Sequence, residues 1–280
     1  ARPAQRGLLF LGCLLAFVRW EPAPYDLFLI IIFLLYARGL TWKSYQLVFV
    51  VLLGPLLFTH VPALGAALEV APERTLYYSL VTLYLALSSV FFMSLPERSV
   101  PLLLLGYEVG ALLSGLLGVL AFLRIPGLED LLWGGSRAVA FFKDPNVFGA
   151  FLIPALFLAL ARLEQGRKFW ILPALILFLG VLVSLSRGAW ANFAVALLAW
   201  WLLRPRKRIW LPLVLLTLAG GVGISVVVMP DNPIVQRLGF MPYDKERFFT
   251  QMEALSLALT QPLGYGPGLS EIHLSYATHN

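Results

Sequence analysis

Apolar residues occur along most of this chain in blocks that short polar connectors separate. A block of about 20 apolar residues is long enough to cross the hydrocarbon core of a membrane as a helix. We count nine blocks, at residues 7–18, 25–37, 45–62, 75–95, 99–123, 146–162, 168–186, 188–203 and 209–229. The pattern predicts an all-α fold, a polytopic bundle of transmembrane helices.

The first two blocks are short, and the connector Trp20-Glu21-Pro22-Ala23-Pro24 lies between them. Proline has no backbone N–H and restricts the residue before it, so this connector predicts a tight turn between two helices. A single kinked segment is the alternative, and it would shift the count by one.

The composition excludes a soluble domain. Of 280 residues, 60% are hydrophobic and 13% are charged, whereas soluble domains carry roughly 25% charged residues. The net charge of +6 does not indicate nucleic-acid binding, because the basic residues lie between apolar blocks, where the positive-inside rule explains them. The single cysteine, Cys13, allows no intrachain disulfide. The first block is followed at once by others, which favours a membrane anchor over a cleavable signal peptide.

Orientation follows from counting Lys and Arg on alternate sides of the predicted helices. A cytoplasmic N-terminus gives 12 on the cytoplasmic side and 9 on the other, with the densest short loop at Arg204-Pro-Arg-Lys-Arg208. Nine crossings then put the last segment outside. We therefore expect a transmembrane domain at residues 1–229 and an extracytoplasmic, periplasmic helical loop at residues 230–280.

The exterior segment contains one predicted helix, from Glu246 to Gln261, which Pro262 ends. Its apolar residues recur at helical spacing and predict an amphipathic helix: Phe248, Phe249, Met252, Leu255 and Leu259. A loop with unusual backbone freedom follows, Gly264-Tyr-Gly-Pro-Gly268.

Arginines at predicted helix ends are the first candidates for a site. Arg187 lies between two apolar blocks in Val183-Ser-Leu-Ser-Arg-Gly-Ala-Trp190. A guanidinium group presents a planar fork of donors that matches phosphate oxygens, so this motif indicates an anion-binding corner. The alternative is a snorkelling arginine that marks a helix end.

Other charged residues are predicted on the same exterior side. Arg137 precedes Lys143, Asp144 and Asn146, where Asp144 and Pro145 have the pattern of a helix N-terminus. The alternative for these residues is capping and ordinary loop charge.

Arg247 opens the amphipathic helix, and a solvated charge is the alternative interpretation for it. His279, near the end of the sequence, can serve as a general base, because histidine titrates near neutral pH. We assign no role to His60, beside Pro62 at a predicted helix end, or to His273.

Known motifs of other chemistries are absent from the sequence. It contains no HExxH, no His pair at i, i+4, no Walker A motif and no dinucleotide fingerprint. Glu108 is the main acid within a predicted membrane segment. A proton-coupled transporter is expected to have more such groups, and paired ones.

Four motifs in this order resemble the O-antigen ligase and O-antigen polymerase superfamily of bacterial membrane glycosyltransferases. They are Arg137 with Phe142-Lys-Asp-Pro-Asn-Val-Phe-Gly-Ala150, then Ser184-Leu-Ser-Arg-Gly-Ala-Trp190, then Arg247 through Pro262 to Gly268, and finally Thr278-His-Asn280. The resemblance covers roughly residues 100–280. In that family the chain continues past the His-Asn pair, so we expect further membrane helices beyond it.

The resemblance implies an inverting glycosyl transfer without metal or cofactor, at the periplasmic face of the bacterial inner membrane. The donor would be a glycan on undecaprenyl pyrophosphate, and the acceptor lipid A–core, another glycan or a protein. Arg187 and Arg247 would hold the donor pyrophosphate, with Arg137 a further arginine of that site and Lys143 and Asn146 in support. His279 would activate the acceptor hydroxyl.

Two alternatives come from other functional classes. A transporter or flippase for a lipid-linked sugar would also need arginines for pyrophosphate, but it would need no exterior histidine and would place more charge within the membrane. A non-catalytic membrane scaffold leaves the grouping of arginines, glycines and histidine unexplained. Ligase, polymerase and protein-glycosylating enzyme share the donor, and we favour the ligase because its motif spacing is closer.

Overall fold

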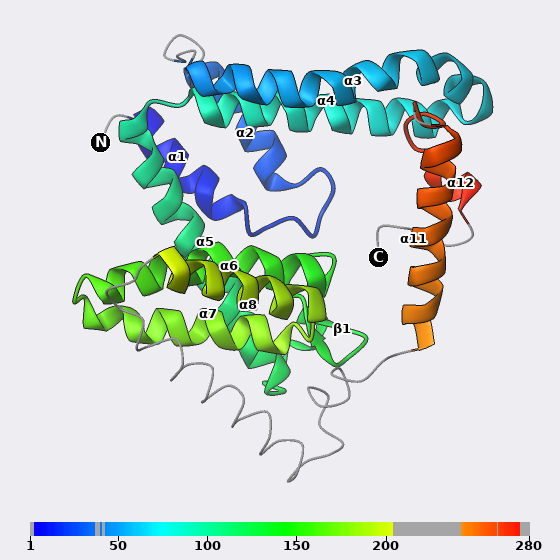
Figure 1. Cartoon of the computed structure of the whole chain (residues 1–280). Coiled ribbons are helices and arrows are strands. Elements are labelled where there is room, and N and C mark those ends of the chain that lie inside the picture. Colours follow the sequence, from blue (N-terminus) through cyan, green and yellow to red (C-terminus); the bar gives the residue numbers. More distant parts are fainter. Residues whose placement is uncertain (1–2, 37–39, 41–42, 204–241, 262, 275–280) are drawn as a thin grey trace. The chain divides into compact units, whose positions relative to one another are not determined.

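The computed structural model describes residues 3–36, 40, 43–203, 242–261 and 263–274 (Figure 1). The described part of the chain is mostly helical, with 77% helix and 2% strand. Its contacts divide it into two compact units. Unit 1 comprises residues 1–35 and 97–239, and unit 2 comprises residues 36–96 and 240–280. The predicted domain boundary at residue 229, and the ninth block at 209–229, lie outside the described residues.

Unit 1 contains the helices that come first in the chain and those of its middle third. Its elements are α1 (Pro3–Leu14), α2 (Pro24–Tyr36), α5 (Val100–Phe122), β1 (Leu132–Trp133), β2 (Arg137–Ala138), α6 (Pro145–Glu164), α7 (Ile171–Val183) and α8 (Arg187–Leu203), with short 3-10 turns at Glu97–Ser99, Glu129–Leu131 and Lys168–Trp170. The connector 20–24 lies between α1 and α2, as the two prolines predict. The antiparallel pair β1–β2, which pairs Trp133 with Arg137, is a small departure from the all-α prediction.

Unit 2 contains α3 (Ser44–Val70), α4 (Pro72–Ser94), α11 (Pro242–Thr260) and α12 (Ser270–His273). The prediction that α3 would end near His60 and Pro62 is wrong, because the helix continues to Val70. Proline is tolerated inside membrane helices, where neighbouring groups compensate for the lost hydrogen bond. The amphipathic helix predicted at 246–261 corresponds to α11.

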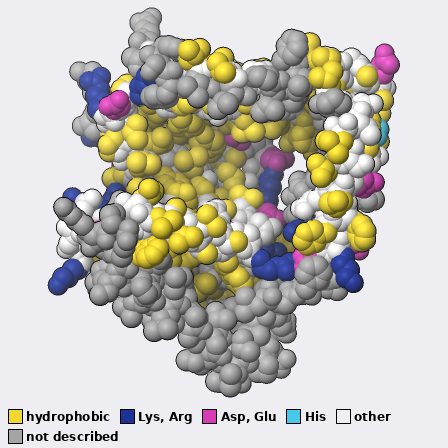
Figure 2. Space-filling view, viewed as in Figure 1, with side chains coloured by type: hydrophobic (Ala, Val, Ile, Leu, Met, Phe, Trp, Pro, Cys, Tyr) yellow, Lys and Arg dark blue, Asp and Glu magenta, His cyan; other side chains and the backbone are white. Residues whose placement is uncertain are grey.

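Three of the described helices are long and apolar enough to cross a membrane: Pro72–Ser94, Glu97–Phe122 and Pro145–Glu164. Apolar helices of this kind indicate a lipid bilayer environment. The helices Pro24–Tyr36 and Lys168–Val183 are apolar but shorter. Figure 2 shows hydrophobic side chains on the surface of the helices, where a soluble protein would carry polar ones.

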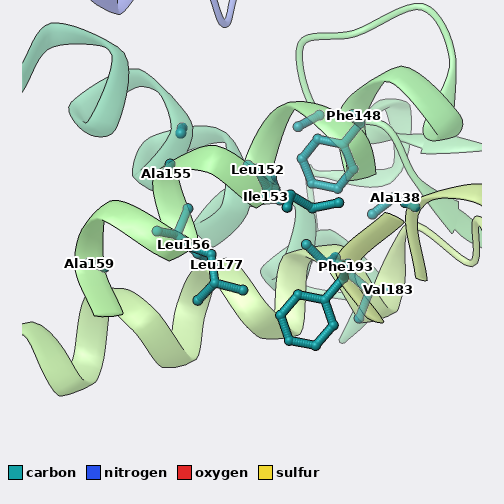
Figure 3. Packing of buried hydrophobic residues seen from close by; sticks show 14 of the residues in the cluster. Ala138, Phe148, Leu152, Ile153, Ala155, Leu156, Ala159, Leu177, Val183 and Phe193 are labelled. Atoms are coloured by element: carbon teal, nitrogen blue, oxygen red, sulfur yellow. The ribbon is translucent and has the colours of Figure 1, made fainter. Parts of the chain in front are cut away.

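The core of unit 1 lies between α5, α6, α7 and α8 (Figure 3). Large side chains from three of these helices interdigitate there: Phe148, Leu152, Leu156, Leu177 and Phe193. Alanines on α6 at positions 155 and 159 are fully buried against them. This core fixes the starts of α6 and α8 relative to the end of α7, and those three ends carry the candidate site.

Glycines allow α1 to pack directly on the backbone of α5. A Cβ atom on Gly110 would lie 2.5 Å from the carbonyl oxygen of Cys13, and one on Gly106 would collide with the carbonyl oxygen of Leu9. Small residues four apart are typical of close helix pairs in membranes. The first helix of the chain is therefore an integral part of unit 1.

Candidate functional site

The corner between α7 and α8 carries Arg187 as the first residue of α8. Ser186 caps α8, because its Oγ accepts a hydrogen bond from the backbone N–H of Ala189 at 3.2 Å. The Oγ of Ser184 accepts a hydrogen bond from the N–H of Ser186 at 3.2 Å and donates one to the carbonyl of Val181 at 2.7 Å. Both serines are buried, so the corner is held by internal hydrogen bonds.

Arg137 connects this corner to the start of α6. Its Nε donates a hydrogen bond to the backbone carbonyl of Ser184 at 3.2 Å, and one terminal nitrogen donates to Oδ1 of Asn146 at 3.1 Å. The side chain is half-buried. The loop before α6, the start of α6 and the distant corner at residue 184 thus meet through one guanidinium group.

The start of α6 has the cap that its sequence predicts. Asp144 accepts a hydrogen bond from the N–H of Asn146 at 2.5 Å, and Pro145 is the first helical residue. Gly149, one turn later, lies against the corner, since a Cβ atom there would be 2.6 Å from Oγ of Ser184. The N-termini of α6 and α8 are therefore neighbours, and their backbone dipoles both favour an anion at this end.

Two residues at this site have a backbone conformation that is rare for side chains of their type. Leu185 has φ 49° and Ala140 has φ 47°, both in the left-handed region. Both are buried. Such strain costs about 1–3 kcal/mol per residue and clusters at functional sites, which motivates a functional interpretation of this corner.

The turn between α1 and α2 also contributes to the site, which the sequence analysis did not predict. Lys143 forms an ion pair with Glu21. Arg19 donates a hydrogen bond to the carbonyl of Asp130 at 2.8 Å, and Phe17 stacks on Phe141 with ring centroids 4.6 Å apart. The only sequence signal for this contact was that each segment was predicted on the exterior side.

The loop before β1 carries one carboxyl group with a perturbed pKa. Backbone N–H groups of Glu129 itself and of Gly127 donate to the carboxylate of Glu129 and lower its pKa. The group is therefore anionic at neutral pH. Glu129 lies in the same loop as Asp130, whose backbone carbonyl accepts the hydrogen bond from Arg19.

Arg247 lies in unit 2, in the second turn of α11, and is half-buried. The glycine loop that follows α11 packs on the hairpin of α3 and α4. A Cβ atom on Gly266 would lie 2.5 Å from Cβ of Ala67, and one on Gly268 would lie 2.7 Å from Cδ2 of Tyr78. Three glycines of this loop adopt left-handed backbone conformations, as the backbone freedom predicted for the loop allows: Gly264, Gly266 and Gly268 have φ of 75°, 109° and 79°.

A pocket of about 260 Å³ lies between α11, the glycine loop and α12. His273 stacks on Tyr265 in its wall, with ring centroids 4.0 Å apart, and Gln261 adds an amide group. The sequence analysis assigned no role to His273. His279, the histidine predicted to be the general base, lies outside the described residues, as does Pro262.

Glu108 is buried in α5 and pairs with Arg162 of α6, with Oε2 and a terminal guanidinium nitrogen 2.5 Å apart. The guanidinium of Arg162 also lies over the ring of Trp170 at 4.1 Å. The main acid of this candidate membrane span thus has a cationic partner on the neighbouring helix. Within the described ranges, no three His, Cys, Asp or Glu side chains gather to hold a metal ion.

Of the predicted site residues, the structure brings Arg137, Asn146 and the helix end of Arg187 together, and it orients Lys143 toward Glu21. Arg247 belongs to the other unit. No family model matches the chain, and no curated protein and no solved structure matches it. The geometry alone indicates an anion-binding corner of two helix N-termini with cationic side chains.

Proposed function

We propose that this protein is a membrane glycosyltransferase that moves a glycan from undecaprenyl pyrophosphate to an acceptor hydroxyl. The observation that carries the proposal is the corner at the start of α6 and α8. There Arg137 bonds both Asn146 and Ser184, and Arg187 begins a helix whose dipole favours anions. Two adjacent helix N-termini with two arginines fit a diphosphate better than a neutral sugar.

The chemistry requires stabilisation of a leaving group. As the bond between the anomeric carbon and the phosphate oxygen breaks, negative charge grows on the pyrophosphate. Donors already fixed in place stabilise that charge without reorganising. The rigidity of the corner supports this role, because its two serines are buried and hydrogen-bonded within the protein. Arg247, the other arginine that the resemblance selects, stays a predicted ligand of the pyrophosphate.

The acceptor hydroxyl is a weak nucleophile and needs a base. In the proposed reaction its oxygen attacks the anomeric carbon from the face opposite the pyrophosphate, its proton passes to His279, and undecaprenyl pyrophosphate leaves. The configuration at that carbon inverts. A positioned general base typically contributes about 100- to 10,000-fold to the rate.

The same donor site serves a ligase, a polymerase or a protein-glycosylating enzyme. We favour the O-antigen ligase type, in which the acceptor is lipid A–core, at the periplasmic face of a bacterial inner membrane. Glu108 is the main acid within the predicted membrane segments, whereas a proton-coupled transporter is expected to have several such groups, and this difference supports an enzyme over a transporter.

Glycan transfer from a lipid-linked oligosaccharide in liposomes, with EDTA present, tests the proposal. We expect the full chain to transfer the glycan and the His279→Ala variant to lose at least about 100-fold of the rate. His273→Ala is the matched control, because His273 is a second histidine near the end of the chain, and it should lose far less.

Three results would contradict this proposal or part of it. Loss of transfer with EDTA would show a metal requirement. Movement of the lipid-linked sugar across the bilayer, with no transfer to any of the three acceptor classes, would favour the transporter. A larger loss in His273→Ala than in His279→Ala would move the base to the pocket beside Tyr265.

A further inference from the structure

Helix α11 carries a stripe of large apolar side chains that remain exposed. Phe248, Phe249, Met252, Leu255 and Leu259 are 55–78% exposed. Four of them are spaced by four, three and four residues, so they lie along one side of the helix. Large apolar side chains that follow one another along a helix mark a surface that contacts lipid or protein rather than water.

The other side of α11 is already used within unit 2. Ala254, Leu257, Ala258 and Gln261, which are spaced by three, one and three residues, line the pocket with the glycine loop. Lys245, Glu246, Gln251 and Thr260 are exposed polar residues outside the stripe. The helix thus has a face that packs on its own unit, polar flanks and an apolar stripe away from the packed face.

The attachment of α11 indicates what the stripe contacts. The loop after α11 is seated at the turn between α3 and α4, where Gly266 meets Ala63 and Ala67 and Gly268 meets Arg74 and Tyr78. Thr75 braces this turn through a hydrogen bond to the carbonyl of Ala67 at 3.1 Å. The C-terminal end of α11 is therefore held at one end of the hairpin.

This end of the hairpin is the start of a candidate membrane span, α4. Only 6% of the apolar window of α4 is buried, and Leu76, Tyr77 and Leu80 are exposed from its first turns onward. A helix of 23 residues with such a surface is covered by lipid. The end of that span, where the glycine loop is seated, lies at the boundary between lipid and water.

We propose that α11 is an interfacial helix whose stripe enters the headgroup–acyl boundary of the bilayer next to α4. An amphipathic helix held at that level buries its apolar residues among lipid chains and keeps its charged flanks in water. Phenylalanine and leucine suit this depth, and Lys245 can reach anionic headgroups. A consequence, which rests on the proposed function, is that Arg247 is held at the level of a lipid-bound pyrophosphate.

Spin labels on the full chain test whether the apolar stripe of α11 lies in the bilayer, and they need no activity assay. In a Cys13→Ala background, labels would be attached at Met252→Cys and Leu255→Cys on the stripe. Labels at Glu246→Cys and Thr260→Cys, on exposed polar positions, are the matched controls. The chain would be reconstituted in vesicles of phosphatidylethanolamine and phosphatidylglycerol. Collision rates with oxygen, which concentrates in lipid, and with a water-soluble nickel complex would be measured for each label.

We expect the two stripe labels to collide mainly with oxygen and the two control labels mainly with nickel. The ratio of the oxygen rate to the nickel rate should therefore be several-fold higher at the stripe than at the controls. Nickel access at the stripe equal to that at the controls would mean that the stripe lies in water. Low access to both reagents with an immobilised spectrum would mean that protein covers it. Either result would overturn the lipid seat, whereas the transfer assay would be unaffected as a test of the enzyme.

Discussion

The corner between α7 and α8 and the glycine loop after α11 are both tight turns that follow a helix, but they are built differently. The corner places a leucine, Leu185, at φ 49° and compensates with buried serine hydrogen bonds. The loop places glycine at each of its three left-handed positions. One turn is held from inside by hydrogen bonds, and the other by its seat on a neighbouring hairpin.

This difference indicates two kinds of role. A strained non-glycine residue persists only where its surroundings fix it, and such rigidity suits a site that must stabilise charge on a leaving group. A glycine loop adopts its conformation at no steric cost, and its contact with α3 and α4 adds to its own backbone hydrogen bonds. We expect substitutions at the corner to affect chemistry, and those in the loop to affect attachment.

The largest expected effect is at the corner itself. Arg187→Ala should reduce transfer by at least about 100-fold, because removing one donor to a developing anion typically costs that much. Arg187→Lys should also fail substantially, since lysine keeps the charge but lacks the planar fork of donors. Transfer rates in liposomes, normalised to the amount of membrane-inserted protein, would measure both.

Arg167→Ala is the control for that comparison, because Arg167 is an exposed arginine in the turn after α6. It should insert and transfer like the unchanged protein. Full activity of Arg187→Lys would mean that a point charge suffices there, and the phosphate-clamp role of the guanidinium group would be wrong.

A smaller effect is expected where α6 packs on the corner. Gly149→Ala would bring a methyl group to 2.6 Å from Oγ of Ser184 and 2.8 Å from Cβ of Ala189. Overpacking of this kind costs about 1–3 kcal/mol. The variant should unfold at a lower temperature and lose transfer, because Ser184 also accepts the hydrogen bond of Arg137.

Gly115→Ala is the matched variant in α5. Its methyl group would lie no closer than 3.7 Å to any neighbour, and both glycines are helical, so both gain the same helix propensity of about 0.5–1 kcal/mol. The melting temperature in detergent should therefore fall in Gly149→Ala and not in Gly115→Ala. Equal melting temperatures of the two variants would show that the residues around Gly149 can move to accommodate the added methyl group.

The sequence predicted the helices well because a membrane permits little else. Eight of the nine apolar blocks fall on described helices, and the cap at Asp144-Pro145 had a recognisable pattern. The end of α3 was misjudged at Pro62, since the rule that proline stops a helix is weaker where neighbouring helices compensate.

The site was less accessible to sequence reasoning. Arg187 could be selected by its placement at a predicted helix end, and Arg137 by its placement in the loop before the predicted sixth segment. Their connection through Asn146 and Ser184 could not, because it depends on how α6 packs on the corner at Gly149. A leucine at positive φ has no sequence signature, and the pairing of Glu21 with Lys143 spans 122 positions of the chain.

The smallest expected effect compares two glycines of the loop. Gly266→Ala would place a side chain at φ 109° and a methyl 2.5 Å from Cβ of Ala67, whereas Gly264→Ala, at φ 75°, meets nothing within 4 Å. Both variants are strained, by about 1–3 kcal/mol, but only the first pushes the loop off α3. Protease cleavage between residues 261 and 269 should therefore accelerate more in Gly266→Ala. Equal cleavage rates would mean that backbone conformation alone sets the loop, and its seat on the hairpin would be incidental.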